Sequence, residues 1–326
     1  MRPKTRVFIT GAGGFLGRAV CRCLAERGYE VYRYCLTNRV YPTIQAGEPI
    51  FGESFAKDWL VRAMKESKPD FVIHLASAGV LEGDNTPSSL FDINIQATKN
   101  LVEAVAEVGC CKIIHTGSCS EYACEDSELI SESSPLGASN YYGATKAASV
   151  QMLLGLSRHL GISAVVLRPF NIYGPGESDK RLIPYLIKQQ LFGLECELTQ
   201  GLQLKDFLFV EDAACGFLSA IEHFDDVVEQ HIHNLCSGIP TSLRDVGELI
   251  VNLLGGDPRL FKWGAKLPRA GEPIQIVGDP SRFMAATGWK PQINLDIGLK
   301  KTILYHRQKA EQSYTIPSKT NRSAAA

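Results

Sequence analysis

A glycine-rich turn near the start of the chain constrains the fold more than any other segment. The sequence TGAGGFLG (residues 10–17) lies between an expected strand and an expected helix, and it carries Gly11, Gly14 and Gly17 at a spacing of three. Glycines allow a tight turn and let backbone N–H groups at a helix N-terminus approach a pyrophosphate. The pattern predicts a dinucleotide-binding β–α unit.

Short apolar runs alternate with longer helical patterns through the first half of the chain. Uncharged apolar runs suit strands that are covered on both faces, and the alternation predicts a parallel sheet with helices on both sides. Strands are expected at 6–10, 30–34, 71–75, 112–116 and 163–167, and helices at 16–27, 59–66, 93–108 and 141–160. The sequence therefore predicts an α/β fold, a Rossmann-type doubly wound parallel sheet.

Beyond residue 170 the alternation loosens, and Pro and Gly become frequent. We expect residues 1–170 to form an NAD(P)-binding Rossmann domain, to which a segment near 205–222 returns. Residues 171–310 are expected to form mainly a smaller C-terminal α/β substrate-binding region. Residues 311–326 are polar and rich in small side chains, which predicts a disordered tail.

Composition excludes several classes of function. The 326 residues are 45% hydrophobic and 21% charged, with a net charge of −1, as in an ordinary globular enzyme. This balance predicts neither a nucleic acid nor an anionic membrane as partner. No apolar run approaches the roughly 20 residues of a membrane span, and residues 1–6 lack the apolar segment of a signal peptide. We expect a cytoplasmic protein.

The ten cysteines predict neither disulfides nor a metal site. Two pairs, Cys21 with Cys23 and Cys110 with Cys111, are too closely spaced for zinc, and no Cys-x-x-Cys motif is present. Several others lie in apolar or strand-like sequence, namely Cys35, Cys196, Cys215 and Cys236. We expect buried free thiols in a reducing compartment and no metal.

Tyr142 and Lys146 lie four positions apart in the expected helix over residues 141–160. This spacing places them on the same helix face. An ammonium beside a phenol favours the phenolate and lowers the tyrosine pKa from about 10. Such a phenol can exchange a proton with a sugar hydroxyl or ketone. The spacing alone occurs by chance in many helices, so the glycine turn gives it weight.

The segment after the second expected strand favours one cofactor. NAD-binding proteins carry an acidic residue there, which holds the ribose hydroxyls. Residues 34–39 read YCLTNR and contain no acid. Arg39, with Asn38 or Thr37, can instead meet a 2′-phosphate. We therefore favour NADP(H) over NAD(H).

Further motifs follow in a fixed order along the chain. They are HLAS (74–77), Asn94, TGSCSEYA (116–123), RPFNIYGPG (168–176), KDFLFVED (205–212), RAGE (269–272) and Asp279. Together with the glycine turn and the Tyr142–Lys146 pair, they make the chain resemble the extended short-chain dehydrogenase/reductase family from about residue 7 to about residue 291. That family comprises NAD(P)-dependent nucleotide-sugar epimerases, dehydratases and ketoreductases.

The resemblance implies roles for individual residues. Tyr142 would be the general acid/base, Lys146 would lower its pKa and bind the nicotinamide ribose, and Ser118 would position the reacting oxygen. Cofactor contacts are implied for Gly11, Gly13, Gly14, Phe15, Leu16, Gly17, Asn38, Arg39, Glu53, Leu75, Ala76, Ser77, Asn94, Thr116, Tyr142, Lys146 and Pro169.

The implied substrate is a nucleoside-diphosphate sugar. Arg269 would grip its pyrophosphate, because a guanidinium binds phosphate oxygens bidentately. Lys205 stands where the family has Arg, so it supplies charge without that fork. Arg168 is equally consistent with a structural role and a binding role. The full set of implied substrate contacts is Ser118, Glu121, Asn171, Lys205, Arg269 and Glu272.

The choice of reaction depends on the residues after Ser118. Dehydratases of this family carry an acid directly after the catalytic Ser/Thr, but here Cys119 and Ser120 follow. Alternation along an extended segment would turn Glu121 away from the face of Ser120. A 4,6-dehydratase is therefore disfavoured.

The remaining pattern favours an NADPH-dependent 4-ketoreductase acting on a nucleoside-diphosphate 4-keto-6-deoxyhexose. The missing acid after the second strand supports it, and the Ser-x-x-Glu-Tyr pattern at residues 118–122 resembles that of the GDP-4-keto-6-deoxyhexose reductases. The alternatives are an NAD-dependent nucleotide-sugar 4-epimerase and a non-catalytic dinucleotide-sensing protein. The resemblance also implies a homodimer through the helices at 93–108 and 141–160, whose apolar residues are equally consistent with packing on the sheet.

Overall fold

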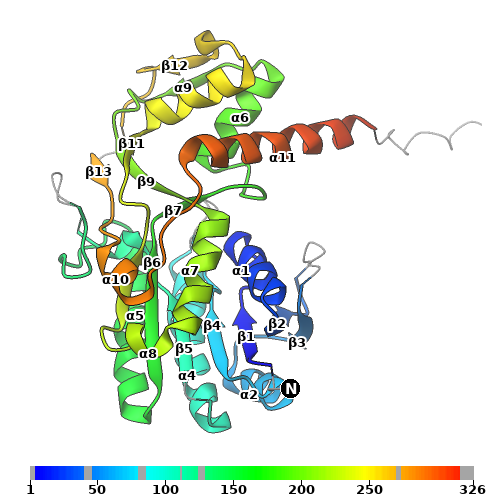
Figure 1. The fold of residues 1–326 in the computed structure, drawn as a ribbon, viewed down its shortest axis with the longest axis vertical. Helices are drawn as coiled ribbons and strands as arrows, with labels where there is room; N and C mark the ends of the chain where they lie inside the picture. The colour runs from blue at the N-terminus through cyan, green and yellow to red at the C-terminus, as the bar shows by residue number, and fades with distance from the viewer. Residues whose placement is uncertain are drawn as a thin grey trace, which may run out of the picture.

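The structure is a computed structural model that describes residues 4–39, 46–79, 86–110, 112–123, 129–268 and 273–315. Figure 1 shows a large lower lobe, which contains the N-terminus and the main sheet, and a smaller upper lobe. The carboxyl ends of the main strands face the upper lobe. This edge is where parallel α/β sheets bind ligands.

The main sheet has seven parallel strands in the order β10-β6-β5-β4-β1-β2-β3. The order reverses direction between β1 and β4, which creates the crevice where dinucleotides bind. The Rossmann-type prediction is confirmed. The strands are β1 (Arg6–Thr10), β2 (Glu30–Leu36), β3 (Glu48–Gly52), β4 (Phe71–His74), β5 (Lys112–Thr116), β6 (Ser163–Pro169) and β10 (Ile232–Leu235).

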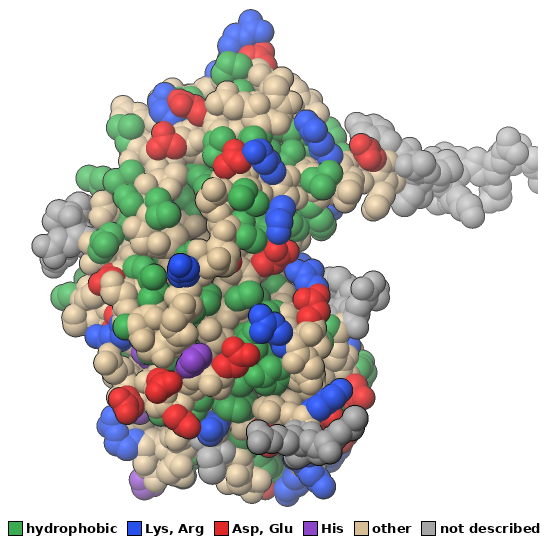
Figure 2. All heavy atoms as spheres, viewed as in Figure 1, with side chains coloured by type: hydrophobic (Ala, Val, Ile, Leu, Met, Phe, Trp, Pro, Cys, Tyr) green, Lys and Arg blue, Asp and Glu red, His purple; other side chains and the backbone are tan. Residues whose placement is uncertain are grey.

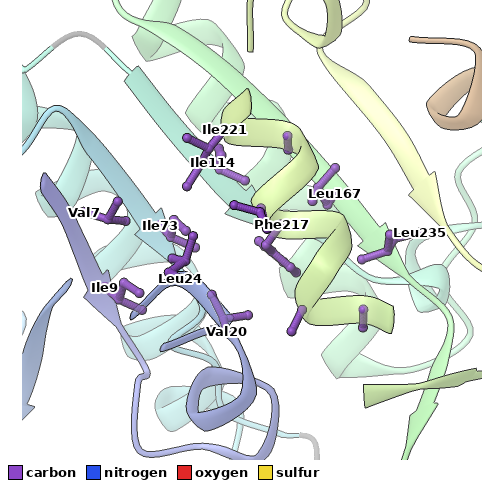
Figure 3. Close-up of a cluster of buried hydrophobic side chains, with 14 of the residues drawn as sticks. Val7, Ile9, Val20, Leu24, Ile73, Ile114, Leu167, Phe217, Ile221 and Leu235 are labelled. Carbon is purple, nitrogen blue, oxygen red and sulfur yellow. The ribbon is translucent and has the colours of Figure 1, made fainter. Parts of the chain in front are cut away.

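Helices cover both faces of this sheet, because alternate strand residues point to opposite sides. On β1, Val7 and Ile9 join one apolar cluster and Phe8 joins the other. Figure 3 shows the first cluster, in which helix residues such as Leu24 and Phe217 pack over the strands. The first face carries α1 (Phe15–Glu26), α7 (Val210–Glu222), α8 (Phe224–Val227) and α10 (Ser281–Thr287), and the second carries α2 (Lys57–Ser67), α4 (Ala97–Val108) and α5 (Tyr141–Leu160).

Two strands of the main sheet, β3 and β10, were not predicted from the sequence. β3 is a short edge strand that contains Pro49, which interrupts a strand pattern. β10 contains the polar residues His233 and Asn234, although both are fully buried. His233 bonds the Val227 carbonyl, and Asn234 bonds the Ile130 carbonyl. These hydrogen bonds, to residues that the strand pattern does not include, provide partners for the buried polar side chains of β10.

The upper lobe has small sheets and a core of its own, which includes Tyr173, Phe209 and Val246. Strands β7 and β13 both pair with β9 in parallel, while β11 pairs with it antiparallel. The elements are β7 (Asn171–Tyr173), α6 (Leu182–Phe192), β8 (Cys196–Leu198), β9 (Leu204–Phe209), β11 (Pro240–Ser242), α9 (Leu243–Leu254), β12 (Phe261–Trp263), β13 (Gln275–Ile276) and α11 (Leu295–Thr315).

The chain returns to the lower lobe later than the sequence pattern indicates. Because β9 pairs within the upper sheet, the return begins at Val210, with α7, and not near residue 205. β10 and α10 also belong to the lower lobe. The start of the expected disordered tail is helical, since α11 continues to Thr315. Extending an existing helix is favourable, because each added residue gains a backbone hydrogen bond. Residues 316–326 lie outside the described part of the chain.

The surface carries mixed charge. Figure 2 shows Lys and Arg side chains interspersed with Asp and Glu over one whole face, without a broad region of a single sign. Within the described ranges, no helix is both long and apolar enough to cross a membrane. Those same ranges hold no group of three or more His, Cys, Asp or Glu residues arranged to bind a metal ion.

Candidate active site

The glycine turn fits a dinucleotide pyrophosphate. Gly11 has a φ of +70°, and a Cβ there would lie 2.5 Å from the backbone N of Ala76. A Cβ on Gly17 would collide with the carbonyl of Gly11. α1 begins after Gly14, and among the described residues no side chain caps its first turn, which also lacks an acid. Its backbone N–H groups can therefore receive an anion.

A buried chain of hydrogen bonds holds the loop after β4 against this turn. Nδ1 of His74 lies 2.6 Å from Oγ1 of Thr10, and its Nε2 lies 3.1 Å from Oγ1 of Thr98. Burial lowers the pKa of His74 to about 3, and the nearby Lys146 charge acts in the same direction. The imidazole is therefore neutral and structural. Sequence reasoning missed Thr10 and Thr98, because the bond partners come from three separate elements.

Asn94 holds the next part of that loop and has no hydrogen-bonding capacity left. It lies in a π-helical turn, η1 (Phe91–Gln96). Its Oδ1 accepts from Ser77 Oγ (3.1 Å) and Ala78 N (2.9 Å). Its Nδ2 donates to the Ala78 carbonyl (3.1 Å) and to Thr145 Oγ1 (2.9 Å). An amide group offers two donors and about two acceptor positions, so the predicted cofactor contact is replaced by a positioning role.

Tyr142 stands near the start of α5, where Oδ1 of Asn140 caps the helix by accepting from Gly143 N. The phenol is half-buried, near the hydroxyls of Ser118 and Ser77. Burial is the largest influence and raises the pKa of Tyr142, while these two hydroxyls lower it. The net shift in the chain by itself is therefore upward, opposite to the direction that the Tyr142–Lys146 spacing predicts.

The position of Lys146 explains that difference. Its side chain is 2% exposed, and its ammonium donates to the carbonyl oxygen of Thr116 at the end of β5. Burial lowers the pKa of Lys146 to about 8. The lysine is thus anchored to the strand, and its charge is itself sensitive to burial.

Ser118 is fixed at the start of a short 3₁₀ turn, η2 (Cys119–Glu121). Its Oγ accepts from the N–H of Ser120 (3.1 Å), and its own N–H donates to Oε1 of Glu121 (2.7 Å). The hydroxyl hydrogen remains available to Tyr142 or to a reacting oxygen. The fold brings Ser118 close to Tyr142, 24 residues later in the sequence.

Glu121 is not a substrate contact. Its Oε2 accepts from Nε (2.8 Å) and Nη2 (2.7 Å) of Arg168, and both side chains are at most 1% exposed. The expectation of an extended segment after Ser118 is wrong, because the 3₁₀ turn directs Glu121 inward. A Cβ on Gly117 would lie 2.6 Å from Oε1 of Glu121, so glycine is needed beside this ion pair.

The surroundings of Arg168 distinguish between the structural role and the binding role that the sequence left equally open. Its guanidinium lies over the ring of Tyr122, with Cζ 4.6 Å from the ring centroid. The Tyr122 hydroxyl donates to Oδ1 of Asn234 on β10. Arg168 therefore joins β6 to the segment after β5 and has a structural role.

The other predicted cofactor residues lie along the carboxyl edge of the main sheet. Asn38 and Arg39 are exposed in the turn after β2, where Arg39 N donates to the Leu36 carbonyl. Glu53 is exposed directly after β3. The remaining ones occupy the turn before α1 and its first residues, the end of β5, the loop after β4 and the end of β6: Gly13, Phe15, Leu16, Thr116, Leu75, Ala76 and Pro169.

The predicted substrate residues are only partly brought together. Nδ2 of Asn171 on β7 donates to the carbonyl of Asp206 (3.0 Å), next to Lys205 on β9. Lys205 is half-buried. Arg269 and Glu272 lie outside the described residues.

Sequence analysis overlooked Asp206, which is fully buried. Its carboxylate accepts from the N–H (2.8 Å) and Oγ (2.7 Å) of Ser237 and from the N–H of Gly238 (2.8 Å). It thus anchors the loop before β11 to β9. The only sequence signal was the acidic residue of the KDF segment, which periodicity does not explain.

Comparisons with known proteins place this geometry in one family. The model of the NAD dependent epimerase/dehydratase family matches residues 7–236. The UDP-glucose 4-epimerase of Rhizobium meliloti is 25% identical over 308 residues, covering 89% of this chain and 93% of that protein. The GDP-6-deoxy-D-mannose reductase of Pseudomonas aeruginosa is 27% identical over 310 residues, covering 90% and 95%.

A solved structure agrees with these sequence relatives. The crystal structure of the Thermus thermophilus UDP-glucose 4-epimerase complex with NAD superposes with a TM-score of 0.81 at 25% identity. The alignment covers 93% of this chain and 99% of that chain. Because the family match spans most of the sequence and includes Ser118, Tyr142 and Lys146, the chain belongs to the NAD dependent epimerase/dehydratase family, as an NAD(P)-dependent enzyme of the extended short-chain dehydrogenase/reductase group.

Proposed function

We propose that the protein is an NADPH-dependent 4-ketoreductase that acts on a nucleoside-diphosphate 4-keto-6-deoxyhexose. The observation that carries this proposal is the convergence of Ser118, Tyr142 and Lys146 near the carboxyl end of β5. The Ser118 hydroxyl and the Tyr142 phenol can both meet one carbonyl oxygen, and the phenol can give its proton to that oxygen.

Each side chain has one task in this proposal. The nicotinamide, when bound, supplies a hydride to C4 of the sugar. Tyr142 donates its phenolic proton to O4, so the carbonyl becomes a hydroxyl. Ser118 donates a hydrogen bond to the same oxygen and orients it. Lys146, held by the Thr116 carbonyl, lies one helical turn beyond Tyr142 and stabilises the phenolate that remains.

The cofactor preference rests on the turn after β2. Arg39 and Asn38 are both exposed there, at the edge of the sheet that carries the glycine turn. A guanidinium can bind the 2′-phosphate of NADP(H) through two parallel hydrogen bonds. Neighbouring Thr37 is also uncharged, so the described part of this turn brings no carboxylate against the phosphate.

The second candidate is an NAD-dependent nucleotide-sugar 4-epimerase. It is favoured by the similarity to UDP-glucose 4-epimerases, one of which was solved in complex with NAD. In that reaction the hydride returns to the opposite face of C4, and Tyr142 both accepts and gives back a proton. A 4,6-dehydratase is less well supported, because Glu121 is committed to Arg168. A non-catalytic dinucleotide sensor would have no use for the complete Ser118–Tyr142–Lys146 set.

We also propose a homodimer and a cytoplasmic location, and Asn171, Lys205, Arg269 and Glu272 as contacts to the nucleoside-diphosphate sugar. The apolar residues of α4 and α5 pack in the core of their own chain, so the dimer proposal rests on the family resemblance. Light scattering of the purified protein tests it. A monomeric mass at micromolar concentration would contradict it.

One assay separates the two reactions. Purified protein is incubated with NADPH or NADH and a panel of UDP-, GDP-, CDP- and dTDP-4-keto-6-deoxyhexoses, and separately with UDP-glucose and no added cofactor. The proposal predicts stoichiometric NADPH oxidation with one ketosugar and no conversion of UDP-glucose. Conversion of UDP-glucose to its C4 epimer without net cofactor oxidation would favour the epimerase instead.

A further inference from the structure

Two cysteines lie together on the outer surface of the lower lobe. Cys23 is on α1 and Cys215 is on α7, 192 residues later, and their sulfur atoms are 4.0 Å apart. The sequence analysis expected buried thiols in apolar surroundings. Cys215 is exposed and Cys23 is half-buried, whereas the other described cysteines are buried.

The packing of α1 against α7 brings these thiols together. Figure 1 shows the two helices side by side on one face of the main sheet, and Figure 3 shows that Leu24 and Phe217, from these helices, pack in the same cluster beneath them. An ion pair between Arg22 and Glu211 joins the same two helices at 3.7 Å. The proximity of the sulfurs is therefore set by two well-packed helices and not by one side-chain rotamer.

The two thiols differ in exposure and in the direction of their pKa shifts. The hydrogen bond between Cys215 and Cys23 is the largest influence on Cys215 and lowers its pKa to about 7. The charge of Arg27 also lowers this pKa, while burial and the carboxylates of Asp212 and Glu211 raise it. The same hydrogen bond raises the pKa of Cys23. Cys215 is the more exposed of the two thiols, and a lowered pKa increases its share of thiolate, which is the nucleophile in disulfide exchange.

We propose that Cys23 and Cys215 form a reversible disulfide that cross-links α1 to α7 when the protein meets a small-molecule disulfide such as oxidised glutathione. This inference is independent of the proposed reaction, because neither thiol belongs to the Ser118–Tyr142–Lys146 set. A disulfide bond is about 2 Å long, so the two sulfur atoms must move about 2 Å closer for the bond to form.

The exchange proceeds in two balanced steps. The Cys215 thiolate attacks one sulfur of oxidised glutathione, which breaks the glutathione disulfide, forms a mixed disulfide and releases one glutathione thiolate. Cys23 then loses its proton to solvent and attacks the Cys215 sulfur, releasing the second glutathione. Two protein thiols are oxidised and two glutathione molecules are formed, so reduced glutathione or dithiothreitol reverses the reaction.

The test is peptide mapping of the native, full-length protein. The protein is incubated with oxidised glutathione, remaining thiols are alkylated, and a non-reducing digest is analysed by mass spectrometry. The proposal predicts one peptide pair linked through Cys23 and Cys215, with loss of two alkylatable thiols, and its disappearance after dithiothreitol. The thermal unfolding midpoint should rise by a few degrees in the oxidised form and fall back on reduction, because the bond closes a very long loop.

Variants separate this pair from the other cysteines. Cys23→Ser should stop at a stable mixed disulfide on Cys215, and Cys215→Ser should leave Cys23 unmodified. Cys35→Ser, which removes a buried thiol on β2, is the matched control and should form the cross-link as the wild type does.

Three results would overturn the proposal. One is a wild-type protein that keeps both thiols alkylatable. Another is a glutathione adduct on Cys215 that persists although Cys23 is present. The third is a cross-link that joins other cysteines. The wild-type peptide map alone decides among these, even if a variant folds poorly.

Discussion

The proton-transfer residues and the cofactor-recognition residues of the candidate site differ in how deeply they are buried. Ser118 and Lys146 are buried at the end of β5, above an ion pair between Glu121 and Arg168 that is almost fully enclosed. Arg39, in contrast, is exposed in a turn after β2. Buried polar groups hold a fixed geometry for chemistry, whereas exposed loop residues can change specificity without disturbing the fold. The reaction type and the choice of cofactor therefore depend on different kinds of residue.

The largest effect should come from removing the phenol. Tyr142→Phe is expected to lower kcat by about 10²- to 10⁴-fold, because it removes the group that gives the proton to O4. NADPH affinity, measured by fluorescence titration, should change little. Tyr141→Phe is the matched control, since its side chain is 71% exposed and lies one residue away. Wild-type turnover in Tyr142→Phe would show that Tyr142 is not the proton donor.

Variants of the buried ion pair between Glu121 and Arg168 test whether this pair holds the proton-transfer residues in place. Glu121→Gln should reduce the free energy of unfolding by about 3–5 kcal/mol, because it leaves the Arg168 charge buried and uncompensated. Glu211→Gln, whose ion pairs with Arg22 and Lys301 are exposed, should cost about 0–1 kcal/mol. Urea denaturation measures both. Equal costs for the two variants would contradict a structural role for Glu121.

Sequence patterns predicted most strands of the main sheet and the glycine turn, because the signals for these features lie within short segments of the sequence. An apolar run and a spacing of glycines carry their own physical reason, so β1, β4 and β5 and the turn before α1 could be placed without tertiary information. The same holds for the helix that carries Tyr142 and Lys146.

What the sequence could not show depends on contacts between distant segments. The sequence predicts that Glu121 contacts a substrate, but Arg168, 47 residues later, lies beside it and binds its carboxylate. Asn94 looks like a ligand contact until its four partners are known. The pKa of Tyr142 follows burial, which a spacing of four residues does not report. Errors therefore concentrate where buried polar groups meet.

Lys146 gives a pH-dependent test of the buried side. Its pKa of about 8 in the folded chain lies below the usual 10.5, so between these values the unfolded chain binds more protons. The free energy of unfolding should therefore rise with pH across that window, by about 1–3 kcal/mol from this group. Denaturation of the wild type and Lys146→Met from pH 7 to about pH 10 measures the difference. Parallel curves would show that Lys146 is not desolvated.

Substitution of the exposed Arg39 should have a smaller effect, and this effect should be confined to the affinity for NADPH. Arg39→Gln is expected to weaken NADPH binding by about tenfold, equivalent to about 1.4 kcal/mol, and to leave NADH binding nearly unchanged. Arg158→Gln, which removes another exposed guanidinium at the far end of α5, should alter neither. Titration with both nucleotides provides the measurement. Equal loss for NADPH and NADH would exclude contact between Arg39 and a 2′-phosphate.

Isotope transfer tests the central claim most directly. The purified protein is supplied with the reactive ketosugar and NADPH deuterated at the transferred position of the nicotinamide ring, and the product sugar is examined by NMR and mass spectrometry. A 4-ketoreductase places one deuterium at C4 for each NADP⁺ formed, and Tyr142→Phe slows both together. Interconversion of C4 epimers with no net NADP⁺ and no deuterium gain would contradict the proposed reaction.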